Sequence, residues 1–448
     1  MAAVTAVSSP TATRTTSGSI TPKRYRALSV VSGVALVLVV LVALALTGAL
    51  ERRTDRLRER TGPVLVATQQ LFSSLAEADA AATAVQLSGA TEDREQRRFY
   101  EQALERSTQQ VERVASLIGD DPDAHQALQG IAAKLTQYAG IVESARTQNR
   151  AGSSAANATL TSALDLMRTG IAADVASLTT ISEQRLDDDY ERPVLRLTLT
   201  VVVLAASLAA LFALQRFMTQ RSRRILNAPT LIGTLAVVVL LVWLVLAERG
   251  QRHDLHAAAD DGYRSIALTS RIQGVAYRAK AEESLALLGT TVGSDAFDSF
   301  RASARTLAVA GVTVSDVEQV RDGRSISGNG LLFDAARLAD SARERYAAGE
   351  MLVRWQRYQD TNATIRTAVA RGDRDAARLT ATTTGNQAFN GFNLSVESAV
   401  QDNTVQFEQS LKSAGHRLRF LRAGGVLLPL AALLLMLWGT QMRIGEYR

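Results

Sequence analysis

Four stretches of the chain contain no charged residue, and each has about the length that an α-helix needs to cross a bilayer. They cover residues 27–50, 197–215, 225–247 and 423–442. A hydrocarbon core of roughly 30 Å takes about 20 apolar residues in a helix. The first stretch is too long for the core of a signal peptide, and a charged segment follows it instead of a cleavage site. The sequence therefore predicts four membrane-spanning helices, the first of which is an anchor.

Positive charge in the short connecting segments predicts the orientation of these spans. The loop 216–224 is the most basic of them, with the arginines Arg216, Arg221, Arg223 and Arg224. We expect this loop and the tails 1–26 and 443–448 to be cytoplasmic, and residues 1–26 to be disordered by composition. The prediction is a multi-pass protein of the plasma (inner) membrane, in contact with membrane lipid and with both termini in the cytoplasm.

The segments 51–196 and 248–422 then lie outside the cytoplasm, and the first has the seam spacing of a helical bundle. Its seam residues recur in steps of three and four: Leu57, Thr61, Val64, Thr68, Leu71, Leu75, Ala78, Ala82 and Val85, then Leu128, Ile131, Leu135, Tyr138, Val142 and Ala145, then Leu160, Leu164, Met167, Ile171, Asp174, Leu178 and Ile181. Breakers near Gly89, Pro122 and Gly152 divide the segment into four helices. Asp121 or Asp123 caps the third.

The second outer segment repeats this plan. Tyr138, Arg146 and Gly152 have the same spacing as Tyr358, Arg366 and Gly372. A stretch rich in Gly, Ser and Asp, 311–330, is the main difference and predicts a loop near the membrane. The predicted fold class is an all-α membrane protein with four transmembrane helices and two tandem extracytoplasmic four-helix bundles, related by internal duplication.

Neither composition nor motifs indicate an enzyme. The chain has no cysteine, four histidines without metal-ligand spacing, and a net charge of only +6 that is scattered along it. These features argue against a structural zinc site and against nucleic-acid binding. No nucleophile elbow, phosphate loop or dinucleotide fingerprint is present, so we expect no catalytic residue and no cofactor. The spans carry no charge, which disfavours a transporter.

Two groups of side chains are candidate binding surfaces for a partner or ligand, because arginine and aromatic residues dominate recognition sites. One is the tip of the first bundle, with Arg94, Arg97, Arg98, Phe99 and Tyr100; the other is Arg354, Trp355, Arg357, Tyr358 and Arg366. The alternatives are a solvated helix start for the first group, and for the second a Trp355 packed in the bundle beside solvated arginines. The four arginines of the loop 216–224 are candidates for cytoplasmic output.

Polar residues on two seams leave two interpretations open. Asn386, Asn393 and Asn403 share one seam of the last helix of the second bundle. They line a polar ligand cavity or fix the register of the helices. Asp174 on the seam of the first bundle is an ion-pair or register residue in preference to a ligand contact.

The layout of two outer bundles between four spans resembles the GlnX-type membrane proteins. The run Trp355-x-x-Tyr358, Arg371-Gly372-Asp373 and Ala376-Ala377 is similar to the turn between the third and fourth helices of bacterial four-helix-bundle sensor domains. The resemblance implies recognition of an amino-acid-binding lipoprotein outside the cell and a relay to a soluble serine/threonine kinase inside. Sensors of this shape are often dimers, so a homodimer is a further expectation.

Two functions therefore compete. The first is a non-enzymatic transmembrane sensor that reads amino-acid availability through a solute-binding protein. The second is an envelope scaffold or an accessory to a transporter. A sensor needs the cytoplasmic arginines for output, whereas a scaffold tolerates other basic residues in their place.

Overall fold

The computed structural model describes residues 55–87, 94–191, 262–288 and 292–445, with scattered positions between 30 and 52 and between 202 and 250. The chain divides into two compact units. One combines Met1–Glu51, Pro193–Gly250 and His416–Arg448; the other, here called the helical unit, combines Arg52–Arg192 with Gln251–Gly415. We refer to these last two segments as its first and second halves.

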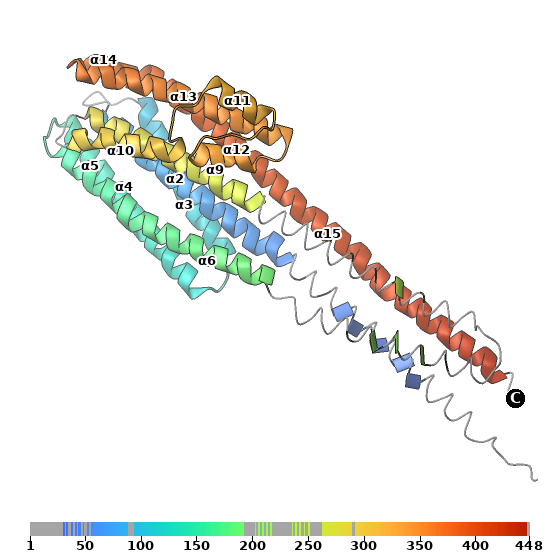
Figure 1. Ribbon diagram of the computed structural model, residues 1–448. Coiled ribbons are helices and arrows are strands. Elements are labelled where there is room, and N and C mark those ends of the chain that lie inside the picture. Colours follow the sequence, from blue (N-terminus) through green and yellow to red (C-terminus); the bar gives the residue numbers. More distant parts are fainter. Residues whose placement is uncertain are drawn as a thin grey trace, which may run out of the picture. The chain divides into compact units, whose positions relative to one another are not determined.

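Every regular element in the described part of the chain is a helix, which confirms the predicted all-α class (Figure 1). The elements of the first half are η1 (Leu57–Thr61), α2 (Gly62–Leu87), α3 (Arg94–Leu117), α4 (Pro122–Arg150), α5 (Ala156–Asp165), η2 (Leu166–Ile171) and α6 (Ala172–Glu191). Those of the second half are α9 (Arg264–Leu287), α10 (Val292–Leu307), α11 (Val314–Arg321), α12 (Leu331–Leu338), α13 (Ala342–Ala370), α14 (Arg374–Thr380), η4 (Ala381–Gly385) and α15 (Asn386–Gly445), which continues beyond the helical unit. The η elements are π-helical turns.

Helix ends follow the local sequence. Asp121 is the residue that caps α4, because its carboxylate accepts hydrogen bonds from the amides of Asp123 and Ala124 at 2.9 Å each. The prediction of a loop over 311–330 is wrong at Val314–Arg321, which form α11. Thr313 and Asp316 form a reciprocal capping box there, which stabilises a helix of eight residues in a Gly- and Ser-rich segment.

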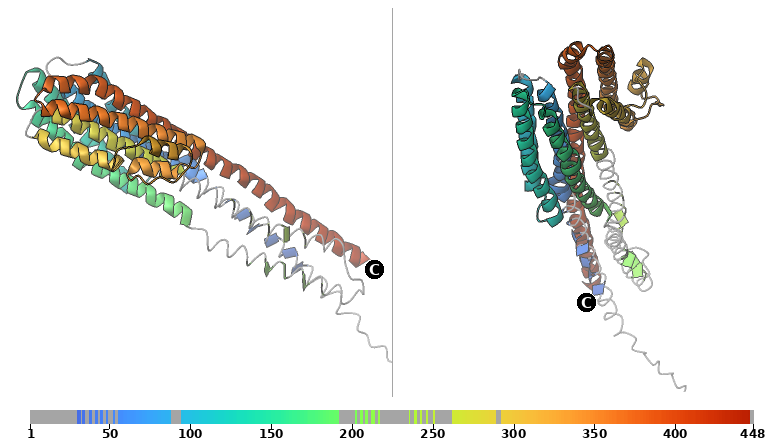
Figure 2. Two further views of the ribbon diagram at one scale, coloured as in Figure 1. Left: turned by 45° about the horizontal axis from the view of Figure 1, so that its top comes forward. Right: turned by 90° about the vertical axis from the view of Figure 1, so that its left-hand side faces the viewer.

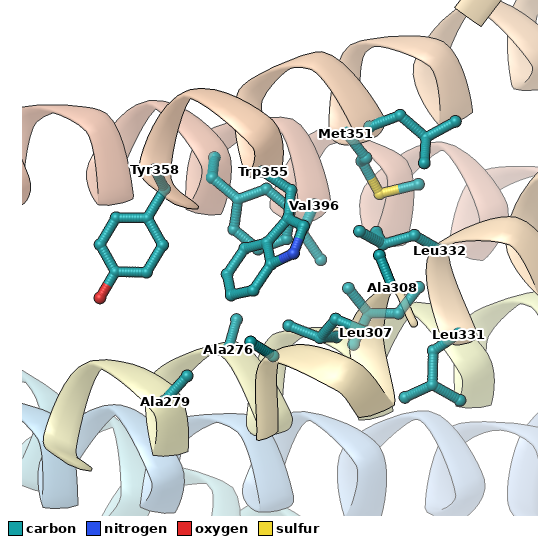
Figure 3. Packing of buried hydrophobic residues seen from close by; sticks show 14 of the residues in the cluster. Ala276, Ala279, Leu307, Ala308, Leu331, Leu332, Met351, Trp355, Tyr358 and Val396 are labelled. Carbon is teal, nitrogen blue, oxygen red and sulfur yellow. The ribbon is translucent and has the colours of Figure 1, made fainter. Parts of the chain in front are cut away.

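The predicted seams form the cores. Every seam residue of α2 and α4 is buried, and so are those of the last helix of the first half apart from Asp174 and Ile181, which are half-buried. In the second half the core is aromatic. Trp355 and Tyr358 are fully buried and project from α13 toward Ala276 and Ala279 of α9, whose small side chains leave room for the rings (Figure 3).

The two halves also pack on each other, which the sequence analysis does not foresee. Their helices run side by side in the helical unit, and α2 packs along α9 (Figure 2). Gly62 and Gly262, 200 residues apart, both contact the ring of Phe407 from α15. Gly274 of α9 lies against the ring of Phe72 from α2. A Cβ atom would lie 3.0 Å from the ring at Gly62 and Gly262 and 2.2 Å from it at Gly274, so these approaches favour glycine.

No helix in the described residues combines the length and the apolar character that a membrane crossing requires. The expected spans 27–50, 197–215 and 225–247 fall largely outside the described residues. The fourth, 423–442, lies in a part of α15 where few side chains are described. The tail 1–26 is also outside them.

Gly274→Ala tests the contact between the halves. The added methyl group overlaps the Phe72 ring, so we expect the free energy of opening of α9 to fall by about 1–3 kcal/mol. Hydrogen exchange of the α9 amides in the intact protein measures it. Gly140→Ala is the matched control, because nothing lies within 4 Å of the added group and a helical Gly→Ala change stabilises by about 0.5–1 kcal/mol. Equal behaviour of the two variants would contradict the close packing.

Candidate functional site: a buried charged network

The seam of α9 is apolar near the start of the helix and charged toward its end. Counted from Ile266 in steps of three and four, it passes Ala276 and reaches Lys280 and Glu283. Lys280 is 6 % exposed and Glu283 fully buried, while the neighbouring Glu282 is 1 % exposed. Charged groups removed from water are costly unless they are paired and hydrogen-bonded. This stretch of α9 must therefore find partners within the helical unit.

Glu283 is the centre of the first set of partners. One carboxylate oxygen accepts a hydrogen bond from the Lys280 ammonium at 2.7 Å, and the other accepts from the Asn362 amide at 2.7 Å. The Asn362 oxygen in turn accepts from the Arg366 guanidinium at 2.9 Å. Lys280 also lies 5.7 Å from the centre of the Tyr358 ring. Burial, and then the Glu283 charge, raise the pKa of Tyr358 well above its ordinary value, so this phenol stays protonated.

Glu282 forms the second set of contacts. It accepts hydrogen bonds from Arg278 at 3.0 Å and from the Ser303 hydroxyl at 2.8 Å. Arg278 is the exposed member of this pair, with 59 % of its side chain accessible. Glu282 therefore ties α9 to α10 while its charge stays connected to solvent through Arg278.

Asp79 brings the first half into the same electrostatic environment. It lies on α2, is 5 % exposed, and has a carboxylate oxygen 3.8 Å from Nε of Arg168. Its other oxygen has no hydrogen-bond partner among the described residues. Burial raises the pKa of Asp79 to about 7, opposed by Arg168 and Arg278 and assisted by Glu282. Of the three charged residues that affect this pKa, Arg278 and Glu282 lie on α9 in the second half.

Each half contributes a π-helical turn to this region. Arg168 belongs to η2, and Ala381 of η4 accepts a 3.4 Å hydrogen bond from Lys280 through its carbonyl. A π-helical turn displaces the hydrogen-bond ladder by one residue and is frequent at functional sites. The two turns thus supply a cation in one half and a carbonyl in the other to buried groups on α2 and α9.

Two residues of the predicted group on α13 take part in the network, and three do not. Tyr358 and Arg366 belong to the network, whereas Trp355 packs in the core with Phe392 and Tyr358. Arg354 donates to Glu350 and to the carbonyl of Gly391, and Arg357 is exposed. Packing of Trp355 in the bundle is therefore what is observed.

The residues of the predicted tip separate by exposure. Arg94, Arg98 and Phe99 are exposed, and Arg97 pairs with Glu101 at 2.7 Å. Tyr100 is buried instead, because it turns inward into the core of the first half. The exposed members remain a candidate contact surface.

Two further predictions concern the four output arginines and the seam residue Asp174. Arg216 is exposed, and Arg221, Arg223 and Arg224 are outside the described residues. Asp174 pairs with Lys134 at 2.7 Å, as an ion-pair role requires.

Sequence reasoning missed Lys280, Glu282, Glu283, Asp79 and Arg168. A signal existed for two of them, because the seam count along α9 places Lys280 and Glu283 inside. The same count along α13, from Met351 through Trp355 and Tyr358, also places Asn362 inside. Asp79 and Arg168 carried no such signal, since their environment depends on the packing of one half against the other.

Comparison with known proteins identifies one similarity. Residues 53–191, which span the first half from η1 through α6, match the family model of the actinobacterial sensor domain. This match supports a sensor domain in the first half and a sensing or signalling role for the protein. No curated protein and no solved structure matches the chain.

The network holds the charged groups of α9 against α10, α13 and η4. No group of three potential metal ligands occurs within the described ranges. The carboxylates of α9 are engaged by cations and amides that hold them in place. A displacement of α9 therefore changes the surroundings of Asp79 on α2.

Asp79 predicts a pH dependence of stability. The folded unit retains a proton on Asp79 up to a pKa of about 7, whereas the unfolded chain releases it near 3.8. Stability therefore falls as pH rises between these values, by up to about 1.4 kcal/mol per pH unit. Asp79→Asn abolishes this dependence, so we expect it to be more stable than the native protein at about pH 8 and similar at about pH 4. Chemical denaturation of both proteins across this range measures it, and equal slopes would refute it.

Breaking the Lys280–Glu283 pair tests the network. Lys280→Met leaves Glu283 buried with one neutral donor, and we expect a loss of about 3–5 kcal/mol of stability. The double variant Lys280→Met/Glu283→Gln removes both charges and keeps an acceptor for Asn362, so it should recover most of that loss. Hydrogen exchange of the α9 amides distinguishes the variants. A double variant as unstable as the single one would show that charge burial is not the cause.

Proposed function

We propose that this protein is a non-enzymatic transmembrane signal transducer of the GlnX type. It receives a solute-binding lipoprotein outside the cytoplasm and relays amino-acid availability to a cytoplasmic partner such as a serine/threonine kinase. The observation that carries this proposal is the sensor-domain match over residues 53–191. The second half has the same order of long helices and a π-helical turn at the same place, which supports two sensor-like halves.

Two features support a relay. The halves pack on each other along α2 and α9, so a partner that moves one half acts on the other. In addition, α15 runs without a break from Asn386 to Gly445, roughly 90 Å at the rise of an α-helix. A continuous helix transmits a small shift or rotation along its axis. The four uncharged stretches support the proposed membrane location.

The proposed inputs and outputs rest on arginines in two segments of the chain. Arg94 and Arg98, with Phe99, form an exposed surface for the outer partner. The loop 216–224 is too short to act except by binding another protein, so its arginines form the proposed contact with the kinase. A homodimer is a further element of the proposal.

Crosslinking of the intact protein in its native membrane, followed by purification and mass spectrometry, tests this function. We expect a solute-binding lipoprotein and a soluble kinase to be recovered together with it. Recovery of only the protein itself, or of cell-wall and secretion machinery, would refute the transducer and favour the envelope scaffold.

A charge-conserving variant sharpens the test. Replacing Arg216, Arg221, Arg223 and Arg224 by lysine keeps the positive charge that orients the spans but removes the planar fork of guanidinium. A transducer should lose the cytoplasmic partner several-fold while it keeps the outer one. A scaffold should show no change.

A further inference from the structure

The second half contains a hollow of about 560 Å³ that the buried network does not use. Its walls come from α9, α12, α13 and α15. In the second half two helices of eight residues each, α11 and α12, follow α10, and α12 forms one wall of the hollow. Its volume lies within the range of about 300–1,000 Å³ of small-molecule sites.

Asn403 is a polar residue of the hollow's lining. Asn403 of α15 is 7 % exposed and lines the hollow, and its side chain makes no hydrogen bond to any described residue. The seam neighbour Asn393, in contrast, accepts a 3.0 Å hydrogen bond from Gln273. A carboxamide with no protein partner offers both a donor and an acceptor to a ligand. Asn403 therefore favours the ligand cavity over the register role.

An ion pair supplies charge of both signs at the same place. Arg343 donates to the two oxygens of Asp402, at 3.1 Å from Nε and 2.6 Å from Nη2. The Arg343 side chain is 79 % exposed, so the pair contributes little to stability and separates at little cost. Glu344, the other carboxylate of the lining, already accepts hydrogen bonds from the backbone amides of Asp340 and Ser341 at 2.9 Å. Arg343 and Asp402 are thus the charges available to a ligand.

The other residues that line the hollow are mostly apolar and indicate which ligand body would fit. Leu268, Met351 and Ala399 form apolar wall, and Ala347 leaves room beside them. A ligand of one charge would replace one member of the ion pair and leave the other unpaired. A ligand with both charges keeps Arg343 and Asp402 paired while its body enters the apolar part.

We propose that this hollow binds a small zwitterionic solute of the amino-acid type directly. Its carboxylate pairs with Arg343, its ammonium with Asp402, and Asn403 hydrogen-bonds the group that reaches furthest inside. The proposal rests on the sensor function proposed above and deepens it, since the protein then reads a solute itself as well as a solute-binding partner.

Calorimetric titration of the intact protein in detergent with each of the twenty common amino acids tests the proposal. We expect at least one neutral amino acid with an apolar or amide side chain to bind. For leucine, 3-methylbutylamine lacks the carboxylate and 4-methylpentanoate lacks the ammonium; the matching analogues of the amino acid that binds should do so at least tenfold more weakly. Binding of none of the twenty, or equal binding of a singly charged analogue, would overturn the proposal.

Variants locate the binding. Arg343→Gln and Asp402→Asn should each weaken it at least tenfold. Ala347→Leu should abolish it, because Ala347 is half-buried and a larger side chain extends into the hollow. Arg324→Gln is the matched control, since it removes an exposed Arg–Asp pair outside the hollow. Binding that survives Ala347→Leu, with the melting temperature unchanged, would overturn the assignment.

The two proposals fail separately. Loss of partner recovery with intact amino-acid binding would refute the transducer alone. Partner recovery without amino-acid binding would refute the hollow as a ligand site alone.

Discussion

The carboxylate of Glu283 is the group around which the helical unit is organised. A fully buried charge is tolerated only with close donors, and here the donors come from two helices: Lys280 of α9 and Asn362 of α13. Lys280 also binds the carbonyl of Ala381 in η4. The positions of α9, α13 and η4 are therefore linked by one buried charge pair. The packing of α2 along α9 connects the second half to the first, and Glu282 and Arg278 of this segment influence the pKa of Asp79 on α2.

Sequence periodicity predicted the helices and most of the cores, because seam spacing is a local property of a helix. Leu71 on α2 and Tyr138 on α4 are examples of seam residues that are buried as predicted. Local capping chemistry explains why Asp121 was correctly predicted as a cap of α4. It also explains why the predicted loop contains α11, since a capping box there stabilises a helix in a segment of loop-like composition. The packing of α2 along α9 was not predictable in this way, since it depends on Gly274 and Phe72, which are 202 residues apart in the sequence.

The candidate site was predicted only in part for the same reason. Tyr358 and Arg366 drew attention as an aromatic–arginine group, and both take part in the network. Their role depends on Glu283 and Asn362, whose charge and amide meet only in the folded unit. Asp79 shows the limit most clearly. Its raised pKa comes from burial between helices, and no local pattern around it in the sequence indicates that burial.

The π-helical turns have a consequence for the history of the chain. A turn of this kind accommodates one extra residue, which rotates everything after it by about 100° relative to an unbroken α-helix. The turn η2 follows the short helix α5, and η4 follows the short helix α14. Each turn contains a glycine, Gly170 or Gly385. Two independent insertions at equivalent places are a less economical account than one. The predicted internal duplication accounts for both turns with a single insertion that precedes the copying.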